Sequence, residues 1–293
     1  MRIFVTGASG WIGSAVVPEL VGAGHQVLGL ARSDAAATAV ADLGAEVLRG
    51  DLTETDVLRT GALDSDGVIH LAFVVPSVTE AATRTDAAAI ETFAGSLAGS
   101  GKPLVISGAT LVTQGRPATE RDELIARGPI AARISNMRTA LAAAERGVRP
   151  SLVMLPRSVH GQGDRHGFIP QLIAMARDKG VSGYIGDGAS RWPAVHVKDA
   201  AALYRLAVEQ APAASVLNAV GDEGVPVREI AEAIGRRLNL PARSLPAGEY
   251  EGMMVPLLST DMPASSAITQ ELLGWKPTHP GLIEDIEQGH YFG

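Results

Sequence analysis

The stretch Arg2-Ile-Phe-Val-Thr-Gly-Ala-Ser-Gly-Trp-Ile-Gly13 decides the fold of this chain. It opens with a short apolar run at residues 3–5, which is typical of a buried parallel strand. Three glycines then follow at three-residue spacing, and residues 14–21 have the spacing of a helix. A strand, a glycine turn and a helix in this order form the context that a dinucleotide site requires.

Each glycine of the turn has its own physical task. Gly7 allows a tight turn, Gly10 lets the backbone approach a pyrophosphate, and Gly13 lets the helix pack close to the strand. The first N–H groups of the helix lack partners and attract phosphate. We therefore expect a cofactor-binding turn made of Gly7, Ser9, Gly10, Trp11, Ile12 and Gly13.

The composition excludes several classes of protein. The 293 residues exceed the common single-domain size of about 100–200 residues. Hydrophobic residues make up 46% and charged residues 19%, which favours a sizeable core over disorder. The net charge of −7 argues against non-specific nucleic-acid binding. The absence of cysteine excludes disulfides, thiolate metal sites and thiol catalysis.

Targeting signals and metal sites are not expected either. No apolar run reaches the roughly 18 residues of a membrane span. The first residues carry no basic n-region, and the first strand is needed for the fold, so we expect no signal peptide and a cytoplasmic protein. Asp164, Arg165 and His166 are of metal-ligand type but lack a recognisable spacing, so we expect no metal.

Apolar runs alternate with helical patterns through the first half of the chain. This rhythm predicts an α/β fold: a doubly wound parallel sheet with helices on both faces and right-handed crossovers. Strands are expected at 3–5, 26–30, 44–49, 67–72, 103–107, 151–155 and 215–219, and long helices at 78–97, 127–146 and 200–210. After Pro156 the rhythm changes to a glycine-punctuated loop at 157–164. We expect a cofactor domain at 1–156 plus about 196–220, and a substrate-binding part at 157–195 and 221–293.

Several motifs carry a family resemblance. They are T-G-x-x-G-x-x-G at the start, H-L-A at residues 70–72, the loop at 157–164, V-H-V-x-D ending at Asp199, and L-G-W-x-P ending at Pro277. Over nearly its whole length the chain resembles the short-chain dehydrogenase/reductase superfamily, in its extended and atypical epimerase/dehydratase-like branch. The resemblance implies a Rossmann domain that carries a smaller C-terminal substrate domain.

The end of the second strand bears on which cofactor binds. An acidic residue there favours NAD, whereas an arginine accommodates the 2′-phosphate of NADP. Arg32 and Ser33 therefore predict NADP(H), and Asp34 fits a helix N-cap. The alternative for Arg32 is a solvated charge at a strand end.

Other cofactor contacts follow from the resemblance. Asp51 and Leu52 resemble the segment of the family that contacts adenine, with a helix cap as the alternative. Leu71, Ala72 and Phe73 follow the fourth strand, where the family's backbone passes the cofactor. His70 itself reads as a core histidine. Arg133 could touch the ribose or the phosphates, and its alternative is an exposed helix charge.

The family's usual catalytic pair is missing. The resemblance implies a Tyr and a Lys spaced Y-x-x-x-K, because a Tyr with a pKa of about 10 needs a nearby cation to work near neutrality. None of the four tyrosines has a Lys four residues later. With Ser135-Asn136 placed on the family's Ser-Lys, Ala132 falls at the Tyr. Asn136 then falls at the Lys, where it could bind the ribose without supplying a charge.

Other side chains could deliver the proton. Ser107 or Thr110, at the end of the fifth strand, could bond a substrate heteroatom, or could simply be satisfied by backbone. His160 is a candidate because histidine is the residue type most often used as a general acid. Tyr184 is a second candidate acid, and packing is the alternative for both. The expected pocket walls are mainly apolar, which suits a hydrophobic ring better than a sugar nucleotide: Phe73, Val74, Thr110, Met137, His160, Phe168, Tyr184 and Trp192.

The sequence is compatible with two kinds of function. The first is an NADPH-dependent oxidoreductase that transfers hydride to a C=N or C=O group of a hydrophobic small molecule. The second is a non-catalytic NADP(H)-binding redox sensor. In either case the resemblance suggests a homodimer that pairs through the helices at 78–97 and 127–146.

Overall fold

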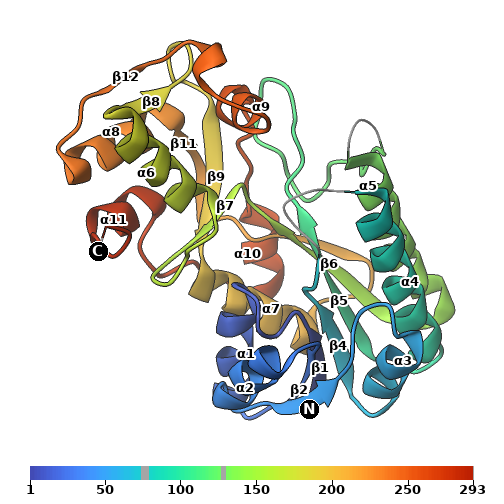
Figure 1. Ribbon diagram of the computed structural model, residues 1–293. Helices are drawn as coiled ribbons and strands as arrows, with labels where there is room; N and C mark the ends of the chain where they lie inside the picture. Colours follow the sequence, from blue (N-terminus) through green and yellow to red (C-terminus); the bar gives the residue numbers. More distant parts are fainter. Residues whose placement is uncertain (74–78, 127–129, 293) are drawn as a thin grey trace.

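A seven-stranded parallel sheet forms the centre of the larger part of the protein (Figure 1). The computed structural model describes residues 1–73, 79–126 and 130–292. The strand order is β10-β6-β5-β4-β1-β2-β3. The strands are β1 (Arg2–Thr6), β2 (Gln26–Ala31), β3 (Glu46–Arg49), β4 (Gly67–His70), β5 (Pro103–Ala109), β6 (Arg149–Leu155) and β10 (Ser215–Asn218).

Helices cover both faces of this sheet. Helices α1 and α7 pack together on one face, whereas α3, α4 and α5 form a row on the other. The helices of this part are α1 (Gly13–Gly22), α2 (Asp34–Asp42), α3 (Thr55–Leu63), α4 (Glu80–Ser96), α5 (Ala131–Ala142) and α7 (Val197–Gln210). The expectation of a Rossmann fold is confirmed.

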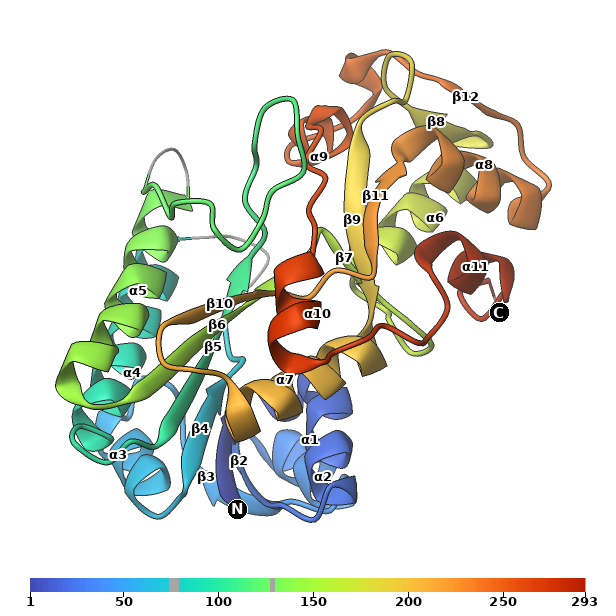
Figure 2. The same cartoon turned by 180° about the vertical axis from the view of Figure 1, so that it is seen from behind.

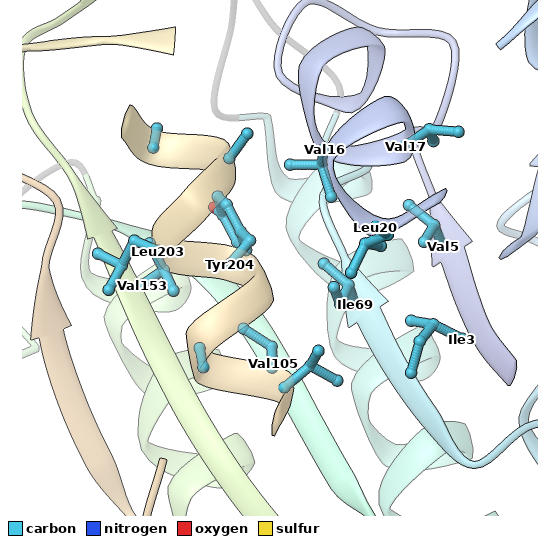
Figure 3. Packing of buried hydrophobic residues seen from close by; sticks show 14 of the residues in the cluster. Ile3, Val5, Val16, Val17, Leu20, Ile69, Val105, Val153, Leu203 and Tyr204 are labelled. Atoms are coloured by element: carbon cyan, nitrogen blue, oxygen red, sulfur yellow. The ribbon is translucent and has the colours of Figure 1, made fainter. Parts of the chain in front are cut away.

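The apolar core between the sheet and the α1–α7 face is continuous. Ile3, Val16 and Leu20 meet Ile69 of β4 there, and Tyr204 of α7 lies over the same face of the sheet (Figure 3). All five side chains are fully buried. The small alanines of α7 let this helix pack close to the strands. This close packing fixes the position of Tyr204 relative to β5.

The smaller part holds two further sheets (Figure 2). A three-stranded sheet has the order β11-β9-β7, and β12 pairs with β8. These strands are β7 (Ser158–His160), β8 (Ser182–Tyr184), β9 (Arg191–His196), β11 (Asp222–Pro226) and β12 (Ala242–Ser244). The helices that surround them are α6 (Phe168–Lys179), α8 (Val227–Leu238), α9 (Met254–Ser259) and α11 (Leu282–Glu287), while α10 (Ala267–Leu273) lies against β10 and α7. Among the helices of the described residues, none is both long and apolar enough to span a membrane.

The chain passes back and forth between the two parts. β10 belongs to the large sheet although it follows β7 and β9 of the smaller part. The loop expected at 157–164 contains the short strand β7, which pairs in parallel with β9. The segment that follows β5, called the strap below, also joins the two parts. Its Ala118 donates to Pro263 O at 2.8 Å and forms a β-bridge with Ala264.

The strand order places the functional edge of the sheet. β1 pairs with β2 on one side and with β4 on the other, so the direction of winding reverses between β1 and β4. In open parallel sheets, ligands bind outside the carboxyl ends of the strands at such a switch point. The glycine turn after β1 and the residues after β4 and β5 meet there.

Candidate cofactor and active site

The glycine turn is packed as tightly as its sequence predicts. Gly7 has a φ of +71°, and a Cβ on it would lie 2.8 Å from the backbone nitrogen of Ala72. A Cβ on Gly13 would lie 2.1 Å from the carbonyl oxygen of Gly7. Side chains at these two positions would therefore separate α1 from β1 and β4.

The N-terminus of α1 has the properties of a phosphate site. Its N-cap residue, Ile12, offers no side-chain cap, and the first turn carries no acidic residue. Gly10 donates to Gly7 O at 3.0 Å, which holds the turn beneath the helix end. Free helix amides and a positive dipole end attract a pyrophosphate, so these residues fit a dinucleotide.

Trp11 joins the glycine turn to the smaller part. Its indole Nε1 donates to Val159 O on β7 at 2.9 Å. Ser9, in the same turn, is exposed. The segment that follows β6 therefore lies over the glycine turn. It borders the space outside the carboxyl ends of the strands, where open parallel sheets bind ligands and which is called the crevice below.

At the end of β2, Arg32 is exposed. Ser33 is the N-cap of α2 and accepts from Ala36 N at 3.2 Å. Asp34, expected as the cap, is instead the first residue of the helix and pairs with Arg49 at 2.9 Å. The carboxylate of Asp34 is thus paired with Arg49 and not with Arg32. Arg32 therefore stays available beside the predicted ribose position.

The Asp51-Leu52 pair lies in a tight turn after β3. Asp51 Oδ1 accepts from the backbone and the hydroxyl of Thr53, both at 3.0 Å. Both Asp51 and Leu52 are half-buried. The alternative of a helix cap is wrong, because the N-cap of α3 is Glu54, and the adenine contact stays a prediction.

His70 is a core histidine, as expected. It is buried, with Nδ1 2.6 Å from Thr6 Oγ1 and Nε2 3.2 Å from Asp86 Oδ1. Asn136 donates to the same carboxylate at 2.6 Å and to Thr83 O at 2.9 Å. Burial raises the pKa of Asp86, but the bonds from His70 and Asn136 outweigh it and keep that pKa below its ordinary value.

This network corrects one prediction. Both amide protons of Asn136 go to α4, so its side chain links two helices rather than reaching out to the cofactor ribose. The sequence could not show this, because Thr83 and Asp86 lie on another helix and carry no motif.

Ser107 and Tyr204 form a hydroxyl pair that the sequence did not predict. Their oxygens lie 2.7 Å apart, and Ser107 Oγ also donates to His70 O at 3.2 Å. With the Ser107 proton on His70 O, the Tyr204 hydroxyl is the donor to Ser107. Tyr204 is fully buried, and this burial raises its pKa, so it stays protonated at neutral pH.

Arg133 is the residue of α5 that reaches Ser107. Its Nη2 donates to Ser107 O at 3.3 Å, and its guanidinium lies 3.7 Å above the Phe73 ring. Burial lowers its pKa, against the field of Asp86. Its Nη1 is buried without a partner among the described residues. Ala132, which the alignment of motifs placed at the family's tyrosine, is exposed instead.

Thr110 and Met137 have different roles. Thr110 is buried, and among residues 1–73, 79–126 and 130–292 its hydroxyl has no partner. It therefore stays a candidate donor at the end of β5. Met137 packs beneath Gly108 in the core between the sheet and α5, so its prediction as a pocket wall is wrong.

The two other candidate acids lie away from this edge. His160 is fully buried, with Nδ1 2.9 Å from Asp285 Oδ2. Tyr184 lies on β8, at the end of the smaller part farthest from the large sheet, under the guanidinium of Arg228 (Figure 1). Both predictions as proton donors at the nicotinamide are corrected, because neither side chain faces the carboxyl ends of β4 and β5.

The remaining predicted walls belong to the core of the smaller part. Trp192 is fully buried and donates to Leu257 O at 3.0 Å. Phe168 packs edge-on against it, with ring centres 6.0 Å apart. Val74 lies outside the described residues. No cluster of three or more metal-ligating side chains is found within the described part of the chain.

A sequence model of the NAD dependent epimerase/dehydratase family matches residues 3–98 and 115–219. The chain belongs to this family. It is 45% identical over 298 residues to "Uncharacterized protein C2A9.02" of Schizosaccharomyces pombe, across 100% of both chains. It is 27% identical over 259 residues to a 2-alkyl-3-oxoalkanoate reductase of Stenotrophomonas maltophilia, which covers 82% of this chain and 77% of that protein.

The solved structures show the same fold. A UDP-glucose 4-epimerase of Thermus thermophilus, solved in complex with NAD, superposes with a TM-score of 0.75 at 20% identity. The match covers 100% of this chain and 99% of that one. Membership of the family indicates an NAD(P)-dependent enzyme of the oxidoreductase or epimerase type.

Proposed function

We propose that this family member is an NADPH-dependent reductase that transfers hydride to a C=O or C=N carbon of a hydrophobic small molecule. The observation that carries the proposal is the Ser107–Tyr204 hydroxyl pair at the carboxyl end of β5. It lies beside the switch point, where the fold positions a nicotinamide ring.

The pair can serve a developing oxyanion. NADPH, when bound, supplies the hydride. Ser107 would then turn its O–H from His70 O to the substrate oxygen and stabilise the alkoxide there, while Tyr204 keeps donating to Ser107 Oγ. The proton that completes the alcohol comes from water. A hydroxyl that accepts one hydrogen bond donates a stronger one, because neighbouring bonds polarise each other. Arg133 adds a positive charge next to Ser107, which favours negative charge on the substrate oxygen.

This arrangement favours a carbonyl over an imine. A carbonyl gains negative charge on oxygen during reduction and therefore needs a donor, which Ser107 provides. A protonated imine already carries its proton, and the cation of Arg133 would repel it. The name of the reductase relative also denotes a ketone substrate, whereas no name among the relatives supports the alternative of a redox sensor.

The choice of NADPH rests on the end of β2. Arg32 is exposed there, and the nearest carboxylate, Asp34, is paired with Arg49. A guanidinium matches a phosphate by charge and by hydrogen-bond geometry. An acid that would bond the ribose 2′-OH of NAD is not free at this strand end.

The direct test is a screen of apolar ketones, enones and cyclic imines with NADPH. Stoichiometric oxidation of NADPH with at least one ketone is expected, and a Ser107→Ala variant should be slower by about 10²–10⁴-fold, the usual contribution of an acid in the transition state. NADPH that binds but is never oxidised by any compound of the panel would argue against the reductase.

We also propose a cytoplasmic homodimer that pairs through α4 and α5. The exposed residues of these helices include Ala81 and Ala88 on α4 and Ala132 and Ala142 on α5, and such small side chains permit close approach of two copies. Light scattering that gives a single 30.3 kDa species would refute the dimer.

A further inference from the structure

Arg157 is a half-buried cation whose charge is not paired by any of the described residues. It follows β6 at the start of the segment that lies over the glycine turn. Its guanidinium contacts the Met262 thioether, with Nε 2.9 Å from Sδ, and lies 5.7 Å from the Trp192 ring centre. Among residues 1–73, 79–126 and 130–292, it forms no salt bridge. Burial lowers its pKa to about 10, so it keeps its charge at neutral pH.

Two acids on the segments around Arg157 are bonded to other residues. Asp261 precedes Met262, yet it accepts three bonds from Arg191, at 2.8, 2.9 and 2.8 Å. Across the crevice, Asp122 is held by Arg116 and by the backbone of Thr119.

Glu120, on the same strap, is bonded through one carboxylate oxygen, whereas its Oε2 is buried without a partner among the described residues. Its Oε1 accepts from the backbone and the hydroxyl of Thr269 at 2.9 and 2.6 Å. The segments outside the described residues contain no Asp or Glu side chain. Movement of Asp261 or Asp122 onto Arg157 would break bonds that already exist.

A half-buried guanidinium without a counter-ion lowers the stability of the protein when no ligand is bound. Removing a guanidinium from water without a carboxylate or carbonyl partner is unfavourable, and a thioether is a weak acceptor. Arg149 shows the contrast, because it is also partly buried but donates to the carbonyl oxygens of Val208 and Ala211. A substitution to methionine at residue 157 would remove the penalty and keep the packing on Trp192.

The position of Arg157 connects it to the crevice. Three segments meet at its side chain: the continuation of β6, β9 through Trp192, and the segment of Met262. Pro263, the residue after Met262, is bonded to Ala118 of the strap that follows β5. These segments border the carboxyl edge of the sheet, on the side where Ser107 lies.

We propose that Arg157 binds an anionic group, a carboxylate or a phosphate, on the substrate of this enzyme. The inference rests on the proposed function for the word substrate, but the anion site itself does not require turnover. The flat guanidinium fork matches both groups through two parallel hydrogen bonds. The substrate is then an apolar molecule with a ketone at one end of the crevice and an anion towards the smaller part.

Three small probes test the site directly: benzoate, phenyl phosphate and neutral benzamide. Their dissociation constants are measured on the full chain without cofactor, by thermal unfolding at constant ionic strength. Benzoate or phenyl phosphate should bind at least tenfold tighter than benzamide. Preference for benzoate assigns a carboxylate substrate, and preference for phenyl phosphate assigns a phosphorylated one.

The variants separate Arg157 from general charge effects. Arg157→Gln should weaken the anionic probe at least tenfold and leave benzamide unchanged. Arg228→Gln, which removes an arginine stacked on Tyr184 in the same part of the protein, should change neither. Arg157→Met should unfold at no lower temperature than the natural protein, because the cation it removes has no partner.

The outcomes are distinct from those of the reductase test. Equal binding of benzoate, phenyl phosphate and benzamide, or equal binding by Arg157→Gln, overturns the anion site even if ketones are reduced. A strong loss of stability in Arg157→Met would also contradict it, since that result assigns Arg157 a structural role. Anion binding that disappears with Arg157 supports the site even if no ketone of the panel reacts.

Discussion

The hydroxyl groups of Ser107 and Tyr204 lie 2.7 Å apart although 97 positions separate the two residues. The bond crosses from the end of β5 to the middle of α7, through the fully buried phenol ring of Tyr204. Helix α5 carries no tyrosine, and this pair gives the protein a hydroxyl donor at the end of β5 instead. The account of the reaction depends on this pair more than on any other contact.

Tyr204→Phe removes the donor to Ser107 and keeps the ring. We expect kcat to fall by about tenfold or more, because Ser107 loses the bond that polarises it, while the Kd of NADPH stays unchanged. The free energy of unfolding should fall by only about 0.5–1.5 kcal/mol, the usual net value of one hydrogen bond.

Tyr250→Phe is the matched control, since the Tyr250 hydroxyl is buried without a partner among the described residues and lies in the smaller part. An unchanged kcat in Tyr204→Phe, with Ser107→Ala inactive, would show that Ser107 works without Tyr204.

Arg32→Ala tests the preference for NADPH. We expect the natural protein to bind NADPH at least tenfold tighter than NADH. The variant should lose about 10- to 100-fold for NADPH alone, in line with a charge-assisted hydrogen bond of about 1.5–3 kcal/mol. Fluorescence titration of both cofactors measures this, with Arg59→Ala on α3 as the control. Equal losses for NADPH and NADH would place Arg32 away from the 2′-phosphate.

Gly13→Ala tests the contact between α1 and β1. The new Cβ would lie 2.1 Å from Gly7 O and 2.6 Å from Ala8 O, and both neighbours are backbone atoms that cannot rotate away. We expect the free energy of unfolding to fall by about 1–3 kcal/mol or more, and NADPH binding to weaken with it. Gly22→Ala, at the other end of α1 with nothing within 4 Å, should show neither loss in chemical denaturation.

His196→Asn tests a buried histidine at the start of α7. His196 Nδ1 accepts from Lys198 N at 3.2 Å, and its ring stacks on His279 at 4.8 Å. Burial and the nearby His160 lower its pKa to about 4. Between about pH 6.5 and pH 4, His196 is therefore protonated in the unfolded chain but not in the folded one. The free energy of unfolding falls as the pH falls through this range.

Asparagine can also accept at this cap position but does not titrate. We expect the free energy of unfolding of His196→Asn to fall less than that of the natural protein over this pH range. Parallel curves for the two proteins would mean that His196 is protonated equally in the folded and unfolded states.

Much of the large part could be predicted from local patterns. A parallel strand buried on both faces leaves a continuous apolar run, and a glycine turn leaves its spacing, so β1, its turn and α1 were predicted within one or two residues. The strand at 215–219 and the helix at 200–210 were also expected from their apolar patterns, and the structure has β10 and α7 there. Short elements such as β7, β8 and β12 have three residues each and leave no such periodicity.

The chemistry of the site could not be predicted in the same way. The partners of Ser107, Asn136 and Arg133 come from other elements, and a hydrogen bond between distant residues leaves no local pattern. His160 lies on a motif-bearing loop, yet its buried imidazole contacts Asp285 near the C-terminus and not the proposed reaction site. Arg157 opens the motif-bearing loop at 157–164, but only the structure shows that it has no counter-ion among the described residues.

Deuterium transfer tests the central claim most directly. NADPH that carries deuterium at the transferable position of the nicotinamide is incubated with the panel of apolar ketones and the natural protein, Ser107→Ala or Tyr204→Phe. Mass spectrometry then follows the label. The account predicts an alcohol with one deuterium on carbon per NADPH consumed, formed by the natural protein and about 10²–10⁴-fold more slowly by Ser107→Ala. Label that never reaches a product despite tight NADPH binding, or that reaches it equally fast in Ser107→Ala, would contradict the account.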